Sequence, residues 1–355
     1  MKNKIAIASA FLAAASFSTA EIVVNDFLSF EGFVDSSYST NQSDFEGDKE
    51  SDNSFGIDQV EISWMFNFDA VTAQIDLEYE DGDEGNNDGV EQAFVNYALG
   101  NGDVITAGRY ASMLGFEAFE PTGLYQYSTA YDFSGILGDA GLAGLLDGAT
   151  VSEYSQGVKF TRSTDTTFFG ISVQDQAFGS DADRLGGDGD SDLDQDSSFA
   201  VEVAGSIAFD NGFTVFVGAA YEDAEFGDNQ LINAYVTYET GAWLFAAEIN
   251  VSDYDDVNLG GANLGNVDGL TGLLMANYAY SDVASVTGRI SSINYESSDV
   301  ELDILKYTVA HNYALSDNLL LVTEVSLDDG ELDVDGLGNA DGDNLTLAVE
   351  LLFSF

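Results

Sequence analysis

The chain has 355 residues, with 63 acidic and 9 basic side chains and a formal net charge of −54. Such an acidic chain repels nucleic acid and anionic surfaces, which argues against nucleic-acid-binding proteins. It has no cysteine for a disulfide framework, and its 45% hydrophobic and 12% aromatic content is too high for a disordered acidic chain.

The first twenty residues have the order of a secretory signal peptide. Lys2 and Lys4 make a short basic start, residues 5–15 are apolar, and Ser18-Thr19-Ala20 supplies small residues before Glu21. The apolar run is too short to cross a bilayer as a helix. We therefore expect cleavage after Ala20, export, and a mature domain over residues 21–355.

From residue 27 onward, the dominant pattern is an alternation of apolar and polar side chains with a period of two, which is typical of strands with two different faces. No segment approaches the length of an apolar transmembrane helix. The alternation predicts about sixteen strands: 27–38, 55–68, 70–80, 90–99, 103–110, 153–163, 166–177, 198–209, 212–222, 230–239, 242–252, 269–281, 284–296, 302–314, 317–328 and 343–355.

The connections between these runs alternate between short and long. The expected short turns are 69, 101–102, 164–165, 211–212, 240–241, 282 and 316. The expected long loops are 39–54, 81–89, 111–152, 178–197, 223–229, 253–268, 297–301 and 329–342. This asymmetry is typical of transmembrane barrels with short periplasmic turns and long external loops.

The sequence thus predicts an all-β fold, a single transmembrane antiparallel β-barrel over residues 21–355. Sixteen strands enclose water rather than a packed core, so the apolar face should meet lipid and the polar face should line the lumen. Aromatic residues near the strand ends, such as Trp64, Trp243 and Tyr280, suit the two interfacial girdles. Aromatic packing in a soluble core is the alternative.

The loop 111–152 is the third long loop and is unusually apolar. It contains the single proline, Pro121, and several aromatic residues, including Phe116, Phe119 and Tyr125. Exposing this much apolar surface to water is unfavourable, by about 25 cal/mol per Å². We expect the loop to fold into the barrel mouth as a constriction, with an external lid or an oligomer contact as the alternatives.

This architecture resembles that of general outer-membrane porins in its strand count, its loop order and its terminal Phe355. A shorter stretch resembles, more narrowly, the OmpL-like β-barrel porin family, through Gly108-Arg109, Gly115-Phe116-Glu117, Glu120-Pro121 and Tyr127-Ser128. The resemblance implies an outer-membrane pore for passive diffusion of small hydrophilic solutes. It also implies that the third external loop is the constriction, that the barrel-assembly machinery reads Phe355, and that a homotrimer is a candidate assembly.

In porins of this kind, basic side chains on the wall face acidic side chains on the inward loop. The candidate basic wall here is Arg109, Lys159, Arg162, Arg289 and Lys306. The candidate acids of the pore loop are Glu117, Glu120, Asp132 and Asp139. Alternation against apolar neighbours directs Arg109, Lys159 and Lys306 to the lumen, whereas Arg162 shares its parity with Phe160, which suits an interface. Unrelated lumen charges paired with nearby acids are the alternative.

Further acidic residues have lumen parity on the strands: Asp76, Glu78, Glu202, Glu248 and Glu324. Rings of carboxylates favour cations, so we expect cation selectivity that weakens as salt rises. The alternative is that these acids only hydrate the wall.

Metal and enzyme chemistry have little support. Asp188, Asp190, Asp192 and Asp194 alternate in a loop and could hold Ca²⁺ loosely, although Gln195 stands where a calcium loop needs glycine. His311 is the single histidine, and no catalytic or nucleotide-binding motif accompanies it. We expect no cofactor and no catalysis. A substrate-selective channel, with Phe33 and Phe94 in the lumen, and a plugged structural or adhesive barrel are the competing functions.

Overall fold

The computed structural model describes residues 21–80, 89–117, 119–133, 153–178, 199–224, 227–259, 262–334 and 338–355. The expected signal peptide therefore lies outside the described residues. The strands are β1 (Ile22–Asn25), β2 (Leu28–Phe45), β3 (Asp48–Phe68), β4 (Val71–Glu80), β5 (Gly89–Gly100), β6 (Asp103–Ala111), β7 (Tyr154–Ser163), β8 (Thr167–Gln174), β9 (Phe199–Ala208), β10 (Phe213–Ala224), β11 (Gly227–Thr240), β12 (Trp243–Leu259), β13 (Ala262–Ser281), β14 (Ala284–Glu296), β15 (Val300–Ser316), β16 (Leu319–Val334) and β17 (Gly338–Ser354). A single turn of 3-10 helix, η1 (Pro121–Gly123), lies between β6 and β7.

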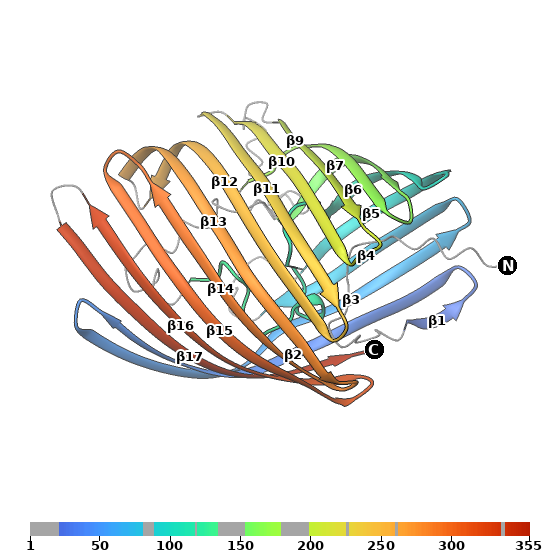
Figure 1. Ribbon diagram of the computed structural model, residues 1–355. Coiled ribbons are helices and arrows are strands. Elements are labelled where there is room, and N and C mark those ends of the chain that lie inside the picture. The colour runs from blue at the N-terminus through green and yellow to red at the C-terminus, as the bar shows by residue number, and fades with distance from the viewer. Residues whose placement is uncertain are drawn as a thin grey trace.

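The sixteen long strands β2–β17 form one closed antiparallel ring (Figure 1). Each strand pairs with the next in the sequence, and β17 pairs with β2 to close the barrel. All sixteen predicted runs overlap a strand of this ring, so the predicted barrel is confirmed. The closed ring leaves none of its long strands with an unpaired edge, which satisfies the backbone without a helix. No helix in the described part of the chain has the length and apolar character that crossing a membrane requires.

The two chain ends meet on one edge of β2. Strand β17 pairs with β2 from Phe33 onward, and the short β1 pairs with β2 at residues 28–30. Between them, the Phe355 N–H donates to the Gly32 carbonyl and the Gly32 N–H donates to the Phe355 carbonyl, both at 2.9 Å. The terminal residue therefore completes the seam of the ring.

Four of the expected long loops are instead extensions of the strands, among them 223–229, whose described residues pair as β10–β11. Strands β2 and β3 continue through the region 39–54 and meet at a tight turn where Glu46 and Gly47 have positive φ angles of 55° and 89°. The regions 253–268 and 329–342 are likewise largely paired as β12–β13 and β16–β17. The extension of β2 and β3 is largely polar, so the sequence alternation stops there, although backbone pairing needs only N–H and C=O groups. In the β12–β13 region, by contrast, Tyr254, Leu264 and Val267 are buried in an apolar cluster.

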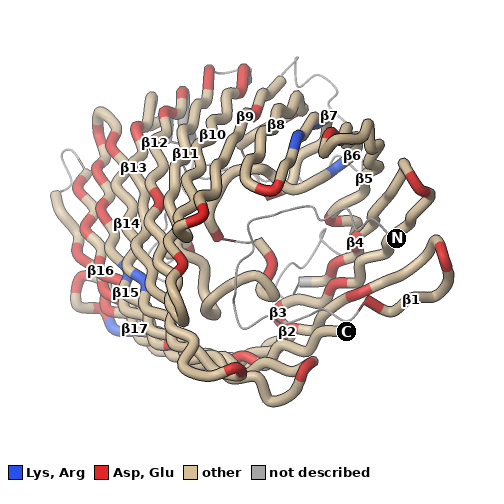
Figure 2. Tube along the Cα trace, turned by 45° about the vertical axis from the view of Figure 1, so that its right-hand side comes forward, with Lys and Arg blue, Asp and Glu red and all other residues tan. Residues whose placement is uncertain are grey.

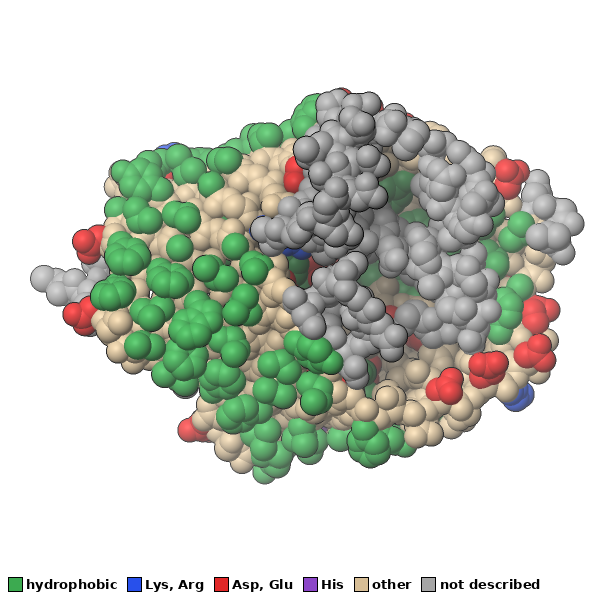
Figure 3. All heavy atoms as spheres, turned by 180° about the vertical axis from the view of Figure 1, so that it is seen from behind, with side chains coloured by type: hydrophobic (Ala, Val, Ile, Leu, Met, Phe, Trp, Pro, Cys, Tyr) green, Lys and Arg blue, Asp and Glu red, His purple; other side chains and the backbone are tan. Residues whose placement is uncertain are grey.

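The outer face of the ring is apolar over its middle part. Figure 3 shows hydrophobic side chains spread over this wall, with acidic side chains toward its margins. On β15, Tyr307 and Val309 point outward and are 45% and 59% exposed, while the alternating Lys306 and Thr308 are buried. This belt is the surface expected to meet lipid acyl chains.

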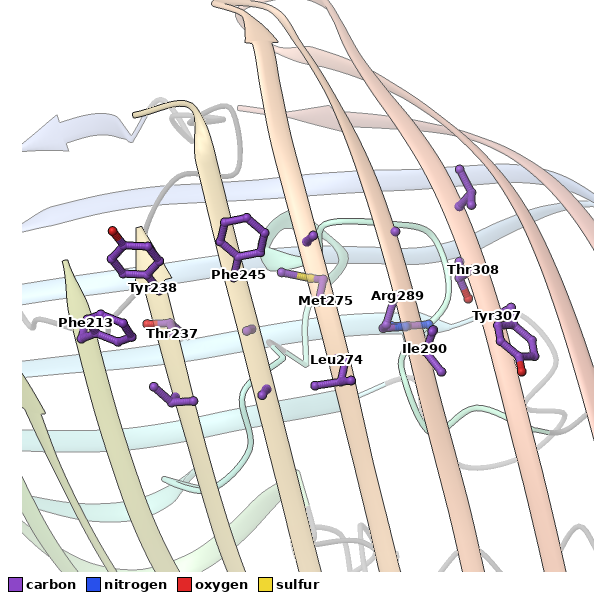
Figure 4. Close-up of a pocket in the computed structure, with 16 residues that line it drawn as sticks. Phe213, Thr237, Tyr238, Phe245, Leu274, Met275, Arg289, Ile290, Tyr307 and Thr308 are labelled. Carbon is purple, nitrogen blue, oxygen red and sulfur yellow. The ribbon is translucent and has the colours of Figure 1, made fainter. Parts of the chain in front are cut away.

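Aromatic rings gather on the outer face near the short turns. Phe213 stacks on Tyr238 with ring centroids 4.3 Å apart, and Trp243 stacks on Tyr278 at 4.4 Å. A shallow apolar depression lies between them and β15, where the small residues Ala247, Ala276 and Gly288 leave the wall thin (Figure 4). It belongs to the outer belt, on the opposite side of the sheet from the interior.

The inner face is only partly polar, whereas the sequence predicted that polar side chains line the lumen. Inward side chains of β9–β15, such as Phe216, Leu231 and Ile293, are buried in an apolar cluster that also contains Leu114 and Phe133 from the connection between β6 and β7. A second cluster joins inward Phe33, Val322 and Leu352 to Tyr127 of the same connection. The inner wall is apolar where this segment packs against it, because those contacts exclude water.

Candidate channel constriction

The described part of the loop after β6, residues 112–117 and 119–133, lies inside the barrel (Figure 2). Its first residues follow the wall formed by β9–β12. The N–H of Met113 donates to Glu202 Oε1 on β9 (2.5 Å), and the N–H of Phe116 donates to Glu248 Oε1 on β12 (2.7 Å). Between them, the N–H of Gly115 donates to Asn233 Oδ1 on β11 (3.2 Å).

The next residues cross to other parts of the wall. The Tyr125 carbonyl accepts from Thr287 Oγ1 on β14 and from Asn312 Nδ2 on β15, both at 2.9 Å. The Ser128 N–H and hydroxyl donate to the two carboxylate oxygens of Glu324 on β16, at 3.1 and 2.7 Å. The segment is thus attached to strands on several sides of the ring, which is the geometry of a constriction.

Tyr127 extends this attachment to the seam side of the ring. Its hydroxyl lies 3.2 Å from Ser37 Oγ on β2 and donates to Asp58 Oδ2 on β3 at 3.5 Å. Burial raises the pKa of Tyr127 to about 12, with the nearby Asp58 adding to the shift. The hydroxyl therefore stays protonated at physiological pH and remains a hydrogen-bond donor.

Arg289 on β14 is the basic side chain most tightly joined to the loop. Its Nη1 lies 2.6 Å from Glu117 Oε1, and its Nη2 donates to the Thr129 carbonyl at 2.8 Å and to Ser128 Oγ at 3.3 Å. The Gln126 amide faces the same guanidinium, and its oxygen rather than its nitrogen is assigned to that side because only the oxygen can accept. The Arg289 side chain is fully buried, so water screens this ion pair little.

Lys306, Lys159 and Arg109 contact main-chain oxygens. Lys306 Nζ on β15 donates to the Asp132 carbonyl at 2.7 Å. Lys159 Nζ on β7 donates to the Ala111 carbonyl at the start of the loop, at 3.0 Å. Arg109 Nε on β6 donates to the Glu91 carbonyl at 2.7 Å. These three cations lie on the inner wall, and two of them hold the ends of the described loop segment.

Arg162 lies apart from this group. Its side chain is 57% exposed at the short-turn end of β7, where Nη2 donates to Asp103 Oδ2 at 2.6 Å. It points away from the loop because it shares the outward parity of Phe160. The structure therefore does not place Arg162 on the pore wall, where it was predicted, and it makes no contact with the described part of the loop.

The predicted lumen acids divide into two groups. Glu202, Glu248 and Glu324 accept hydrogen bonds from the loop, and Glu248 also accepts from the Tyr131 hydroxyl at 2.9 Å. Asp76 and Glu78 on β4 contact wall residues instead, accepting from Gln92 Nε2 at 2.8 Å and from Gln59 Nε2 at 2.5 Å. Sequence parity indicated that these acids face inward but not that three of them anchor the loop.

The predicted pore-loop acids take different places. Glu117 pairs with Arg289 and also accepts from the Ala130 N–H at 2.6 Å, within the loop. Glu120 lies on the far side of the barrel, where it accepts from the Tyr154 hydroxyl at 2.6 Å and from Gln59 Nε2 at 2.9 Å. Asp132 contributes its carbonyl to Lys306. Asp139, and the candidate calcium residues Asp188, Asp190, Asp192 and Asp194, lie outside the described residues.

The loop needs these acceptors because it has almost no secondary structure of its own. A buried backbone N–H without a partner is costly, so strand carboxylates that receive such donors stabilise the inward position. A sequence signal for this role exists in principle. Several acids with inward parity face a long apolar loop that must bury its backbone, but their pairing spans up to 196 residues along the chain.

Solved structures with a similar fold are outer-membrane proteins. The outer membrane channel DcaP of Acinetobacter baumannii aligns with a TM-score of 0.62 at 10% identity, over 92% of this chain and 97% of that one. An anion-selective porin from Comamonas acidovorans gives 0.62 at 12% identity, over 92% and 99%. OmpT of Vibrio cholerae gives 0.60 at 13% identity, over 94% and 100%. No protein-family model and no curated protein matches the chain, so the likeness is one of fold.

Proposed function

We propose that this protein is an outer-membrane porin through which small hydrophilic solutes diffuse passively. The observation that carries the proposal is the closed ring of sixteen strands, apolar outside, with an inward loop anchored to strands on several sides. Sixteen-stranded barrels are too wide for wall side chains to fill, so a loop that crosses the interior sets the size of what passes. No cofactor or reaction is needed for this activity.

The fold neighbours support the same class, since they include a channel and a porin by description. The proposed location is the bacterial outer membrane, reached through the predicted signal peptide, and the finer OmpL-like resemblance is proposed with it. The seam formed by Phe355 is consistent with a terminal signal for the assembly machinery. A homotrimer is the proposed assembly, as one solved form of the Vibrio cholerae OmpT is a trimer.

Cation selectivity is the proposed charge preference. Among the described residues, the inward cations Arg289, Lys306 and Lys159 are engaged by the loop, and Glu117 neutralises the first of them. Further inward acids lie on β3–β5, including Asp76 and Glu78, which accept hydrogen bonds from wall amides. A wall with excess carboxylate raises the local concentration of cations. One of the fold neighbours is anion-selective, so this preference must be measured on this chain.

The zero-current potential of the refolded protein in a planar bilayer under a KCl gradient tests the proposal. We expect stepwise conductance and a potential of the sign for cation preference. We also expect the preference to weaken from about 0.1 M to about 1 M mean salt, because the Debye length falls from about 10 Å to about 3 Å. A potential of the opposite sign would show that the few cations control the constriction, and insertion without conductance would favour a plugged structural or adhesive barrel. Conductance that saturates with one sugar or ion would favour a substrate-selective channel.

The membrane-spanning belt has a direct test on β15. We expect Val309→Arg to lower the free energy of unfolding in lipid bilayers by about 2–4 kcal/mol, because it places a charge on the outer face near the middle of the belt. The matched control is Glu301→Arg, which faces outward at the start of the same strand and should change the value little. Equal effects of both variants in urea titrations would contradict the assigned belt.

A further inference from the structure

Three glutamates converge on the inner wall opposite Arg289, at the place where the loop meets β3, β5 and β7. Glu61 comes from β3, Glu91 from β5 and Glu120 from the loop. One carboxylate oxygen of each lies within 4.8 Å of the other two. The site joins residues that are far apart in the sequence, and no pattern in the sequence grouped these three residues.

Two of these carboxylates are buried, and each has one oxygen without a hydrogen-bond partner. Glu61 and Glu91 are 6% and 8% exposed, and the Oε2 atom of each lacks a hydrogen-bond partner in the structure. The loop-anchoring acids Glu248 and Glu324 differ in this respect, because both carboxylate oxygens of each accept hydrogen bonds. Burying an unsatisfied carboxylate oxygen costs free energy, so a further partner is expected at each of these two atoms.

The donors to these side chains position the cluster, and Arg109 on β6 lies beside it, with its Nε donating to the Glu91 carbonyl at 2.7 Å. The Ser63 hydroxyl donates to Glu61 Oε1 at 2.5 Å, which leaves Oε2 free to turn inward. The Tyr154 hydroxyl and Gln59 amide hold the two oxygens of Glu120, at 2.6 and 2.9 Å. These three donors are neutral and orient the carboxylates, and the single charge of the Arg109 guanidinium, 6.0 Å from the Tyr154 ring centroid, offsets the repulsion among three carboxylates only in part.

We propose that Glu61, Glu91 and Glu120 bind a hard divalent cation, with Ca²⁺ the best fit. Calcium takes oxygen ligands at about 2.3–2.6 Å, so two ligands on opposite sides of the ion are about 4.6–5.2 Å apart. The three carboxylate oxygens lie within 4.8 Å of one another, which is close enough for all three to contact one such ion. Mg²⁺ requires shorter bonds and stricter octahedral geometry, so it fits this set less well. The remaining ligands would be waters from the lumen.

The cation would join the loop to the wall. Glu120 belongs to the loop, whereas Glu61 and Glu91 belong to strands, so an ion between them ties the loop to β3 and β5. The Arg289–Glu117 pair ties the same loop to β14. The two attachments lie on different parts of the ring, and together they would hold the constriction from both sides.

Binding is tested by calorimetric titration of CaCl₂ into the refolded mature protein, at about 1 M KCl so that exposed acids are screened. We expect one site in the unmodified protein that is lost or much weaker in Glu91→Gln. Disturbing residues around a metal ligand already costs about 10–100-fold in affinity, and removal of a ligand should cost at least that. The control is Glu350→Gln, a buried glutamate of β17 with 3% exposure, which should leave the site intact.

Glu61→Gln provides the second variant if Glu91→Gln does not refold, since it keeps the Ser63 contact. Equal isotherms for the unmodified protein and both glutamine variants would overturn the proposal, as would tighter binding of Mg²⁺ than of Ca²⁺. A proton shared among the three carboxylates, rather than a metal ion, would give equal isotherms of this kind.

The effect on the pore rests on the proposed function, whereas the binding measurement does not. With the site filled, the wall loses negative charge, so millimolar Ca²⁺ should move the zero-current potential toward zero in the unmodified protein but not in Glu91→Gln. Calcium binding in a barrel that does not conduct would refute the porin and keep the site. Conductance together with equal calcium binding by the two proteins would refute the site and keep the porin.

Discussion

Replacing Arg289 with methionine is expected to lower the free energy of unfolding by about 3–5 kcal/mol and to raise single-channel conductance. The substitution removes a fully buried guanidinium that lies 2.6 Å from Glu117. It leaves that carboxylate and the Thr129 carbonyl without their main partner in a region shielded from water, and breaking one half of a buried pair costs about this much. The loop then loses its attachment to β14, which widens the constriction. Urea unfolding in lipid and planar-bilayer recordings measure the two effects.

Two further variants separate this result from a general loss of charge. Arg162→Met removes an arginine that is 57% exposed and paired with Asp103, so a loss of less than about 1 kcal/mol is expected. The double variant Arg289→Met with Glu117→Gln should recover part of the loss, because no unpaired charge remains buried. If Arg162→Met lowered the free energy of unfolding as much as Arg289→Met, the assignment of Arg289 as the attachment of the loop to β14 would be wrong.

Phe133→Ala should be comparably destabilising, by about 3–5 kcal/mol, through loss of apolar packing rather than charge. Phe133 is 1% exposed and lies in the cluster that joins the loop to inward residues of β9–β15. Truncation leaves a cavity that the strands cannot close, because their positions are set by the ring. The loop should therefore detach on this side, which again raises conductance.

The matched control for Phe133 is Phe55, which is 83% exposed on the polar extension of β3. Phe55→Ala should change the free energy of unfolding by about 0.5 kcal/mol or less and leave conductance unchanged. A large conductance change in Phe55→Ala, or none in Phe133→Ala despite its loss of stability, would contradict the inward packing of the loop.

The roles of individual charges show how far parity alone leads. Alternation placed Lys306 and Glu248 on the inner face, and it left Arg162 with the outward Phe160. It did not reveal that Glu248 receives the Phe116 N–H, because that contact joins residues 132 positions apart. The cluster of Glu61, Glu91 and Glu120 likewise draws on β3, β5 and the loop, and no local pattern connects them.

The lengths of the polar extensions also could not be predicted from the sequence. Strand β2 continues to Phe45, well past the predicted end at residue 38. Above the apolar belt both faces of a strand meet water, so polar residues serve on either side and the period of two disappears. The backbone pairing persists because it depends on main-chain groups rather than on side chains.

The sequence by itself determined the all-β class, the sixteen strands, and which side chains face inward or outward in the belt. It could do so because lipid on one face and a lumen on the other impose a period of two on every spanning strand. Only the tertiary structure decided which inward acids anchor the loop, which cation clamps it, and where unpartnered carboxylates gather. Those outcomes depend on contacts between a loop without a periodic pattern and strands far away in the chain, and closure of the ring brings them together.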